Sequence, residues 1–195
     1  MRKVLSIAAL VLVAGLGVSL MSARGAAPAN GASNDAPKAA PSPSEAVLAQ
    51  WNDIGRKLIA MAEDFPEDKY EFKPVPEERT FAAQLLHVSG SMYYFTDPAE
   101  GKKPRYPDDP KSDDLKTKAQ IVAFAKKCVA DGAAEIKAKG DKGMADLVTD
   151  PESKQQTRVA DFAYGLIEHS GEHYGQLVVY YRVAGLVPPE SRPKK

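Results

Sequence analysis

The chain has 195 residues, a length that predicts one domain. Its 26 basic residues balance its 26 acidic ones, and this balance excludes a nucleic-acid surface, which would need an excess of Lys and Arg. The chain contains a single cysteine, Cys128, so no internal disulfide forms and an apolar core must supply the stability.

The first 27 residues have the pattern of a secretory signal peptide. Arg2 and Lys3 precede an apolar run over 4–20, and small residues follow through Ala27. The alternative is an uncleaved anchor, because residues 4–21 approach the ~20 residues that span a bilayer. The small residues favour cleavage. We therefore expect a periplasmic or secreted protein with a mild negative charge and no membrane span in the mature chain.

Residues 28–43 are mostly Pro, Ala, Ser, Asn and Gly, a composition that predicts a flexible linker. The domain is expected over residues 44–193. Ser44 is a candidate N-cap for a first helix over 45–65, where apolar side chains recur at helical spacing and Pro66 ends the pattern.

A second helix is predicted from about residue 79 to 96. Its apolar residues are spaced by 4, 3, 4 and 3, which is typical of a face in a bundle core, and Asp97-Pro98 is expected to end it. A polar connection over 97–111 leads to a third helix over 112–139. Cys128 lies among the apolar positions of that helix and is interpreted as a buried residue, because no charge pattern nearby would activate a thiol.

A fourth helix is predicted over 158–184, with Gly185 as its C-cap. No alternating pattern is long enough to predict a strand. The sequence therefore indicates an all-α four-helix bundle. The short first connection and the long second one favour an up-down-down-up topology, in which the second and fourth helices are antiparallel neighbours.

The three histidines of the chain occupy related positions. His169 and His173 are four residues apart, so both imidazoles lie on one face of the fourth helix. His87 lies near the middle of the second helix, at a matching height. Convergence would give a site for zinc, nickel or iron with one open ligand position, as in catalytic metal sites. The alternative is three buried, hydrogen-bonded histidines without a metal.

Other residues are candidates for lining this pocket. Small residues would leave room for a water or a substrate; they are Ala83, Gly90, Ser91, Ser170, Gly171 and Gly175. Tyr94 and Gln176 are candidate pocket residues, with ordinary packing and capping as the favoured alternative for each. Residues 169–173 also match the H-x-x-E-H peptidase motif, but too little chain follows to supply the further ligand, so we interpret the match as accidental. A general-base role for Glu172 stays open as the weaker alternative to a solvent-facing side chain.

Two segments together resemble the DinB/YfiT-like family. They are FAAQLLH at 81–87 and EHSGEHYGQL at 168–177, and the tail YYRVAGLVPPES at 180–191 also looks like the end of that family's domain. The resemblance covers residues 44–193. It implies an up-down-down-up bundle, often dimeric, and a divalent metal held by His87, His169 and His173.

The resemblance says less about the reaction. Characterised relatives include transferases and isomerases that use low-molecular-weight thiols, which are chiefly intracellular, whereas the signal pattern predicts export. Two hypotheses therefore stay open: a metal-dependent enzyme, hydrolase- or transferase-like, acting on a small molecule, and a non-catalytic metal-binding or stress-related module.

Overall fold

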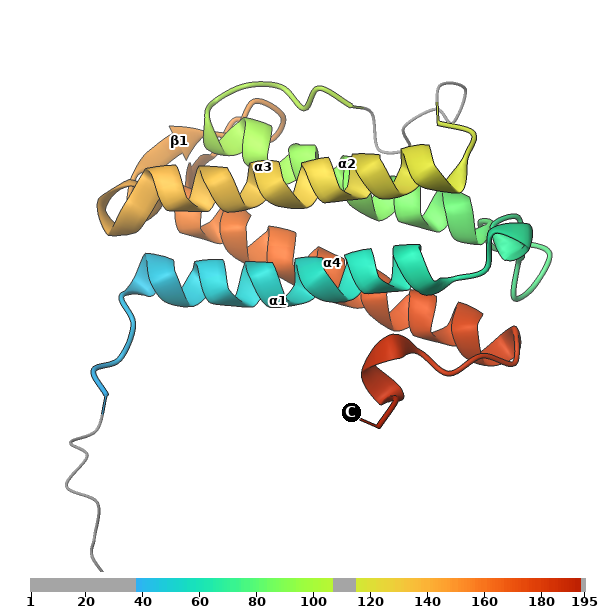
Figure 1. Cartoon of the computed structure of the whole chain (residues 1–195). Helices are drawn as coiled ribbons and strands as arrows, with labels where there is room; N and C mark the ends of the chain where they lie inside the picture. Colours follow the sequence, from blue (N-terminus) through green and yellow to red (C-terminus); the bar gives the residue numbers. More distant parts are fainter. Residues whose placement is uncertain (1–37, 107–114, 194–195) are drawn as a thin grey trace, which may run out of the picture. The chain divides into compact units, whose positions relative to one another are not determined.

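A computed structural model describes residues 38–106 and 115–193, and these form four α-helices, one β-hairpin and two short 3-10 helices. The helices are α1 (Pro43–Asp64), α2 (Phe81–Ala99), α3 (Lys118–Met144) and α4 (Val159–Val183), shown in Figure 1. This confirms the predicted helical bundle. The signal-peptide pattern and most of the predicted linker lie outside the described residues.

Side-chain caps set where the first three helices begin. Ser42 caps α1 by accepting a hydrogen bond from the backbone N–H of Glu45, whose carboxylate in turn accepts from the backbone N–H of Ser42. Thr80 caps α2, and Thr117 caps α3 with Gln120. The predicted starts at Ser44 and at residue 112 were therefore wrong, because the reciprocal caps lie elsewhere.

The expected stop at Asp97-Pro98 was also wrong, since α2 continues through Ala99 with Pro98 inside it. A proline removes one backbone donor, and here the loss falls in the last turn. Asp97 stabilises that end of the helix. Its buried carboxylate accepts from the backbone N–H of Arg105 at 2.8 Å and from its guanidinium. Gly101, with φ of 71°, then reverses the chain.

The segment between α3 and α4 contains a small sheet that the sequence analysis missed. Strands β1 (Leu147–Thr149) and β2 (Gln156–Arg158) pair antiparallel, with Val148 opposite Thr157. Each strand has only three residues, too few for a readable alternation. The turn is held by Asp150, which accepts from the backbone N–H of Glu152 and the hydroxyl of Ser153. Before it, α3 continues past Gly140, where the backbone kinks, to Met144.

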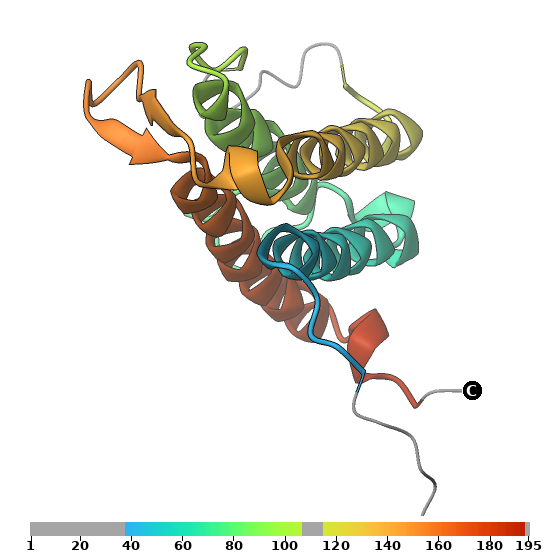
Figure 2. The same ribbon diagram turned by 90° about the vertical axis from the view of Figure 1, so that its left-hand side faces the viewer.

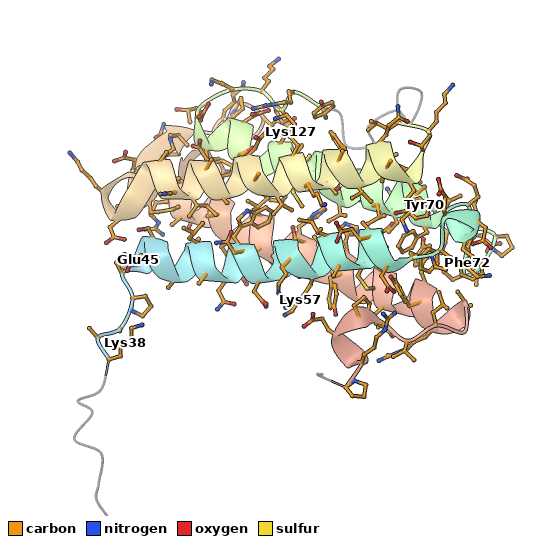
Figure 3. The ribbon with its side chains drawn as sticks, viewed as in Figure 1. Lys38, Glu45, Lys57, Tyr70, Phe72 and Lys127 are labelled. Atoms are coloured by element: carbon orange, nitrogen blue, oxygen red, sulfur yellow. The ribbon has the colours of Figure 1, made fainter. Side chains whose placement is uncertain are left out.

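Each helix packs against two principal neighbours: α2 contacts α3 and α4, and α1 contacts the same two (Figure 2). The predicted contact between the second and fourth helices is therefore confirmed. Aromatic rings fill one end of the core, where Phe65 stacks on Phe81 at 3.7 Å between ring centroids. Tyr70 lies at the same end (Figure 3) and donates a hydrogen bond to the carbonyl of Ala62 at 2.5 Å.

Cys128 is 1% exposed, and burial raises the pKa of its thiol to about 12. The thiol is therefore protonated at physiological pH, which fits the interpretation of Cys128 as a core residue. Among the described helices, none combines the length and the apolar character needed to cross a membrane.

Candidate metal centre

The middle of α2 is buried on most sides, and this is what places His87 inside the bundle. Nearly every residue from Phe81 to Tyr93 is buried, and His87 itself is 5% exposed. On α4, burial follows the face that packs inward and includes His173, which is 7% exposed. His169, one turn earlier on the same face, is half-buried. The group therefore reaches solvent on the His169 side.

The structure brings all three predicted histidines together. One ligand nitrogen from each lies within 4.8 Å of those from the other two. The Nε2 atoms of His169 and His173 are 3.1 Å apart, and the ring centroid of His87 lies 4.6 Å from that of His173 and 5.6 Å from that of His169. Two helices far apart in sequence thus present three imidazoles to one point.

The second nitrogen of His173 contacts two glutamine side chains. Its Nδ1 lies 2.5 Å from Nε2 of Gln84 and 2.9 Å from Oε1 of Gln176. The two amides also contact each other, because Gln84 Nε2 donates to Gln176 Oε1 at 2.5 Å. Gln84 is 1% exposed, and its Oε1 has no hydrogen-bond partner among the described residues. The amides thus form a polar layer behind His173.

The sequence analysis missed Gln84. A signal for it existed: Gln84 is a polar residue on an otherwise apolar helix face, three positions before His87, so both side chains lie on one side of α2. Gln176 was a candidate pocket residue, and it does contact the histidine group.

Burial lowers the pKa of His173 below its ordinary value; the hydrogen bond that Gln176 Oε1 accepts acts in the opposite direction, and the nearby His87 lowers the pKa further. Desolvation disfavours the imidazolium, because a charge inside the bundle loses its hydration. His173 is therefore neutral at physiological pH. A neutral imidazole has the free lone pair that a metal ligand requires.

Phe95, two turns after His87 on α2, closes the other side of the group. Its ring centroid is 5.6 Å from that of His169. Gly165 makes room for this ring, since a Cβ at that position would lie 2.8 Å from Phe95 Cε1. The absent side chain at residue 165 thus allows an aromatic wall beside His169.

Several other candidates lie elsewhere. The hydroxyl of Tyr94, which is 41% exposed, donates to Glu152 in the hairpin turn. Glu172 is exposed on α4. Gly171 and Gly175 have open space where a Cβ would be, and they lie about half a helical turn around from His169 and His173. These two glycines therefore form part of the outer face of α4 and do not line the histidine group.

The donor set fits a divalent metal ion. Tetrahedral zinc with Zn–N bonds of about 2.0–2.1 Å needs its nitrogens roughly 3.4 Å apart. The His169–His173 pair, at 3.1 Å, is close to that separation. The nitrogen of His87 lies within 4.8 Å of both. The second nitrogen of His173 has an amide oxygen available, as metal-ligating imidazoles require.

Comparison with known proteins identifies the family and similar folds. The family model of the DinB superfamily matches residues 50–177. No protein with a curated description matches the sequence. Among solved structures, a DinB-like protein from Bacillus cereus ATCC 10987 superposes with a TM-score of 0.62 at 18% identity, covering 74% of this chain and 95% of the other.

A second similar structure is YfiT from Bacillus subtilis, described as "a probable metal-dependent hydrolase with an unusual four-helix bundle topology". Its TM-score is 0.59 at 13% identity, with 77% of this chain and 94% of YfiT covered. A conserved protein from Enterococcus faecalis gives 0.52 at 12% identity, covering 75% and 99%. These likenesses show the fold, and the match of the family model to most of the domain shows the family: the chain belongs to the DinB superfamily.

Proposed function

We propose that this protein binds one divalent metal ion, such as zinc, nickel or iron, through His87, His169 and His173, and that it is a metal-dependent enzyme acting on a small molecule. The observation that carries the proposal is the convergence of three ligand nitrogens within 4.8 Å. Three imidazoles leave an open ligand position, which is the arrangement of catalytic sites.

A metal bound there would supply a Lewis acid that polarises a substrate or activates its attacking group. The chain's own residues hold and orient the ligands: Gln176 lies against the Nδ1 of His173, and Phe95 packs beside His169. The half-buried His169 gives the side from which a substrate would approach. The description of YfiT as a probable metal-dependent hydrolase favours hydrolysis over group transfer.

Activity assays with panels of substrates test the proposal that the protein is a metal-dependent enzyme. Purified protein is loaded with zinc, nickel or ferrous iron and assayed with ester, amide and thiol-transfer substrates. The proposal expects turnover that a chelator abolishes, that metal restores, and that His173→Ala lacks. Metal bound at one ion per chain with no turnover in any panel would favour the alternative, a non-catalytic metal-binding or stress-related module.

We also propose the up-down-down-up topology for the bundle. Figure 1 supports it: the sequence colours advance in one direction along α1 and α4 and in the opposite direction along α2 and α3. The long connection between α2 and α3 has the length needed to join two helices that run the same way.

Export to the periplasm or medium is a further proposal, supported by the signal pattern in residues 1–27. Expression of the full-length gene, followed by cell fractionation and N-terminal sequencing, tests it. We expect the protein outside the cytoplasm with a new N-terminus near residue 26 or 28. A cytoplasmic protein that keeps Met1 would contradict export.

We propose that two copies pair antiparallel through the outer face of α4. Tyr164, Gly171, Gly175 and Arg182 lie within a narrow stripe of that face, because Tyr164 and Arg182 are about five whole helical turns apart. A two-fold axis near residue 173 would place Arg182 of one copy over the Tyr164 ring of the other, a favourable cation–π contact. Tyr164 is 71% exposed, and the open space beside Gly171 and Gly175 permits close helix approach.

Light scattering across a concentration series tests this pairing. Arg182→Glu and Gly175→Leu are expected to shift the wild-type dimer to monomer, because one removes the cation and the other blocks close approach. Lys137→Glu, at an exposed position of α3, is the control and should leave the dimer intact. A monomeric wild type, or a dimer that survives both α4 variants, would contradict the proposal.

A further inference from the structure

The Nδ1 atom of His173, the ring nitrogen that does not face the other imidazoles, has unusual surroundings. Nδ1 of His173 is within hydrogen-bond distance of an amide donor, Gln84 Nε2 at 2.5 Å, and of an amide acceptor, Gln176 Oε1 at 2.9 Å. A neutral imidazole carries one proton, on either Nδ1 or Nε2. A site with only a donor, or only an acceptor, would favour one of these tautomers; this site accommodates both.

We infer that Gln84 and Gln176 form a pair of positioning residues that supports both tautomers of His173, so that the ring proton moves from Nε2 to Nδ1 when metal binds. The inference rests on the metal site proposed above and deepens it. It concerns the groups behind the ligand and leaves the identity of the metal open.

In the metal-free protein, the short contact with Gln84 indicates that Nδ1 accepts. Two N–H donors at 2.5 Å would repel each other, whereas Gln84 Nε2 has two hydrogens and can donate one to Nδ1 and one to Gln176 Oε1. The ring proton is then on Nε2, where it donates to Nε2 of His169 at 3.1 Å. The contact that remains, between Nδ1 and Gln176 Oε1 at 2.9 Å, joins two acceptors, and Gln84 Nε2 bridges them by donating one hydrogen to each.

With metal bound, the Nε2 lone pair must be free, so the proton belongs on Nδ1. Gln176 Oε1 is the acceptor at hand. Gln84 still donates to that oxygen and holds it in place, while the contact between Gln84 Nε2 and Nδ1 loosens. One proton leaves Nε2 and one arrives at Nδ1, so the total charge of the ring is unchanged. The amide pair thus keeps a buried ring hydrogen-bonded in both states.

Substitution of Gln84 and substitution of Gln176 should change the metal affinity by different amounts. Gln176 supports only the metal-bound tautomer directly, so its loss should weaken metal binding. Gln84 stabilises the metal-free tautomer through Nδ1 and the metal-bound one only through Gln176. A substitution at Gln84 should therefore change the metal-free tautomer most and the affinity least. A structural role alone would not separate the two residues in this way.

Two measurements test the inference: the zinc dissociation constant by competition with a chromophoric chelator, and the tautomer of His173 by long-range ¹H–¹⁵N spectra of ¹⁵N-histidine protein. We expect wild-type His173 to carry its proton on Nε2 without metal and on Nδ1 with zinc. Gln176→Leu should weaken zinc binding roughly 10–100-fold, the range for residues that support a ligand. Gln176→Glu, which keeps an acceptor, should restore it.

Gln84→Leu should move the metal-free proton toward Nδ1 and change zinc affinity much less than Gln176→Leu; Gln84→Met is a second variant of similar size. Gln50→Leu, on the exposed face of α1, is the matched control and should behave as wild type. A metal-free proton already on Nδ1 in the wild type, or equal zinc affinity in Gln176→Leu and Gln50→Leu, would overturn the inference. If the wild type binds no zinc, the proposed metal site fails, and the metal-free spectra of wild type and Gln84→Leu still decide the role of the glutamines.

Discussion

His87 on α2 and His173 on α4 meet with ring centroids 4.6 Å apart, although half the domain separates them in sequence. The contact depends on α2 packing directly against α4 and on both residues lying near the middle of their helices. His169 joins them because it is one turn from His173 on the same face. This geometry is the physical basis of the proposed metal site, and it ties the site to the packing of the bundle.

The metal-free protein should lose stability as the pH falls from neutral to mildly acidic. Burial lowers the folded-state pKa of His173 below the unfolded value of 6.5. The unfolded chain therefore binds more protons in this range, and stability decreases as pH drops from 6.5 through the lower folded pKa. Above pH 6.5 this contribution is fully present. Urea unfolding of the metal-free protein at pH 7.5, 6.5 and 5.5 measures it.

The control for this pH effect is His173→Gln, which removes the titrating group. Its stability should change less over the same interval than that of the wild type. Acidic residues with lowered pKa, such as Asp64 beside Arg192, act only below about pH 3.8 and do not enter this range. An equal change of stability between pH 7.5 and 5.5 in the wild type and in His173→Gln would show that His173 does not cause the pH dependence.

Gly55→Ala should destabilise the bundle, because the added methyl group would overcrowd the contact between α1 and α3. A Cβ at residue 55 would lie 2.5 Å from Cγ1 of Val129. Overpacking costs about 1–3 kcal/mol, and the better helix propensity of alanine returns roughly 0.5–1 kcal/mol of it. The net result is a lower midpoint in thermal or urea unfolding.

A double-mutant cycle separates this steric effect from others. Val129→Ala alone should also destabilise, because it leaves a cavity. The pair Gly55→Ala with Val129→Ala should lose less stability than the two single changes added together, since the new methyl group enters the space vacated by valine. Strict additivity would mean that the close approach of the two helices is not the cause.

Asp97→Asn should weaken the end of α2 without affecting the histidine group. The carboxylate of Asp97 is 3% exposed and accepts from the backbone and guanidinium of Arg105. Asparagine keeps the shape and loses the charge. Since Arg105 is half-exposed, solvent screens the pair, and we expect a loss of about 1–2 kcal/mol.

The zinc affinity of the Asp97→Asn variant is its internal control. Residue 97 is about 15 Å along the helix from His87, so ligand geometry should be unchanged. Equilibrium unfolding and zinc competition on the same samples measure both quantities. Wild-type stability in this variant, or a large loss of zinc affinity, would contradict the separate roles assigned to the two ends of α2.

Much of the architecture was predictable because the helices carry strong periodic patterns. The spacing of Phe81, Leu85 and Val88 predicted α2, and the i, i+4 pair predicted that His169 and His173 share a face. The predictions were wrong where local chemistry outweighed the pattern. Pro98 is tolerated because Asp97 and Arg105 hold the last turn, and the hairpin depends on turn contacts of Asp150 that no alternation reveals.

The sequence analysis predicted that the three histidines converge, and it missed one of the glutamines that contact them. Histidines are rare enough here for their positions to be informative, whereas one polar residue such as Gln84 on an apolar helix face does not by itself indicate what it contacts. Gln84 becomes meaningful only when α2 and α4 bring it next to Nδ1 of His173. Small residues misled in the other direction, since Gly171 and Gly175 face outward from α4. Helical spacing already indicates this, because a residue two positions from His169 or His173 lies about 200° around the helix.

Zinc titration of the wild type and of His87→Ala, His169→Ala and His173→Ala tests the three-histidine site most directly. Metal-stripped protein is titrated in competition with a chelator, and circular dichroism checks that each variant is folded. The account predicts one zinc ion per wild-type chain and a loss of more than about 100-fold in affinity for each variant. A wild type that takes up no zinc, nickel or iron, or folded variants that bind as the wild type does, would contradict it.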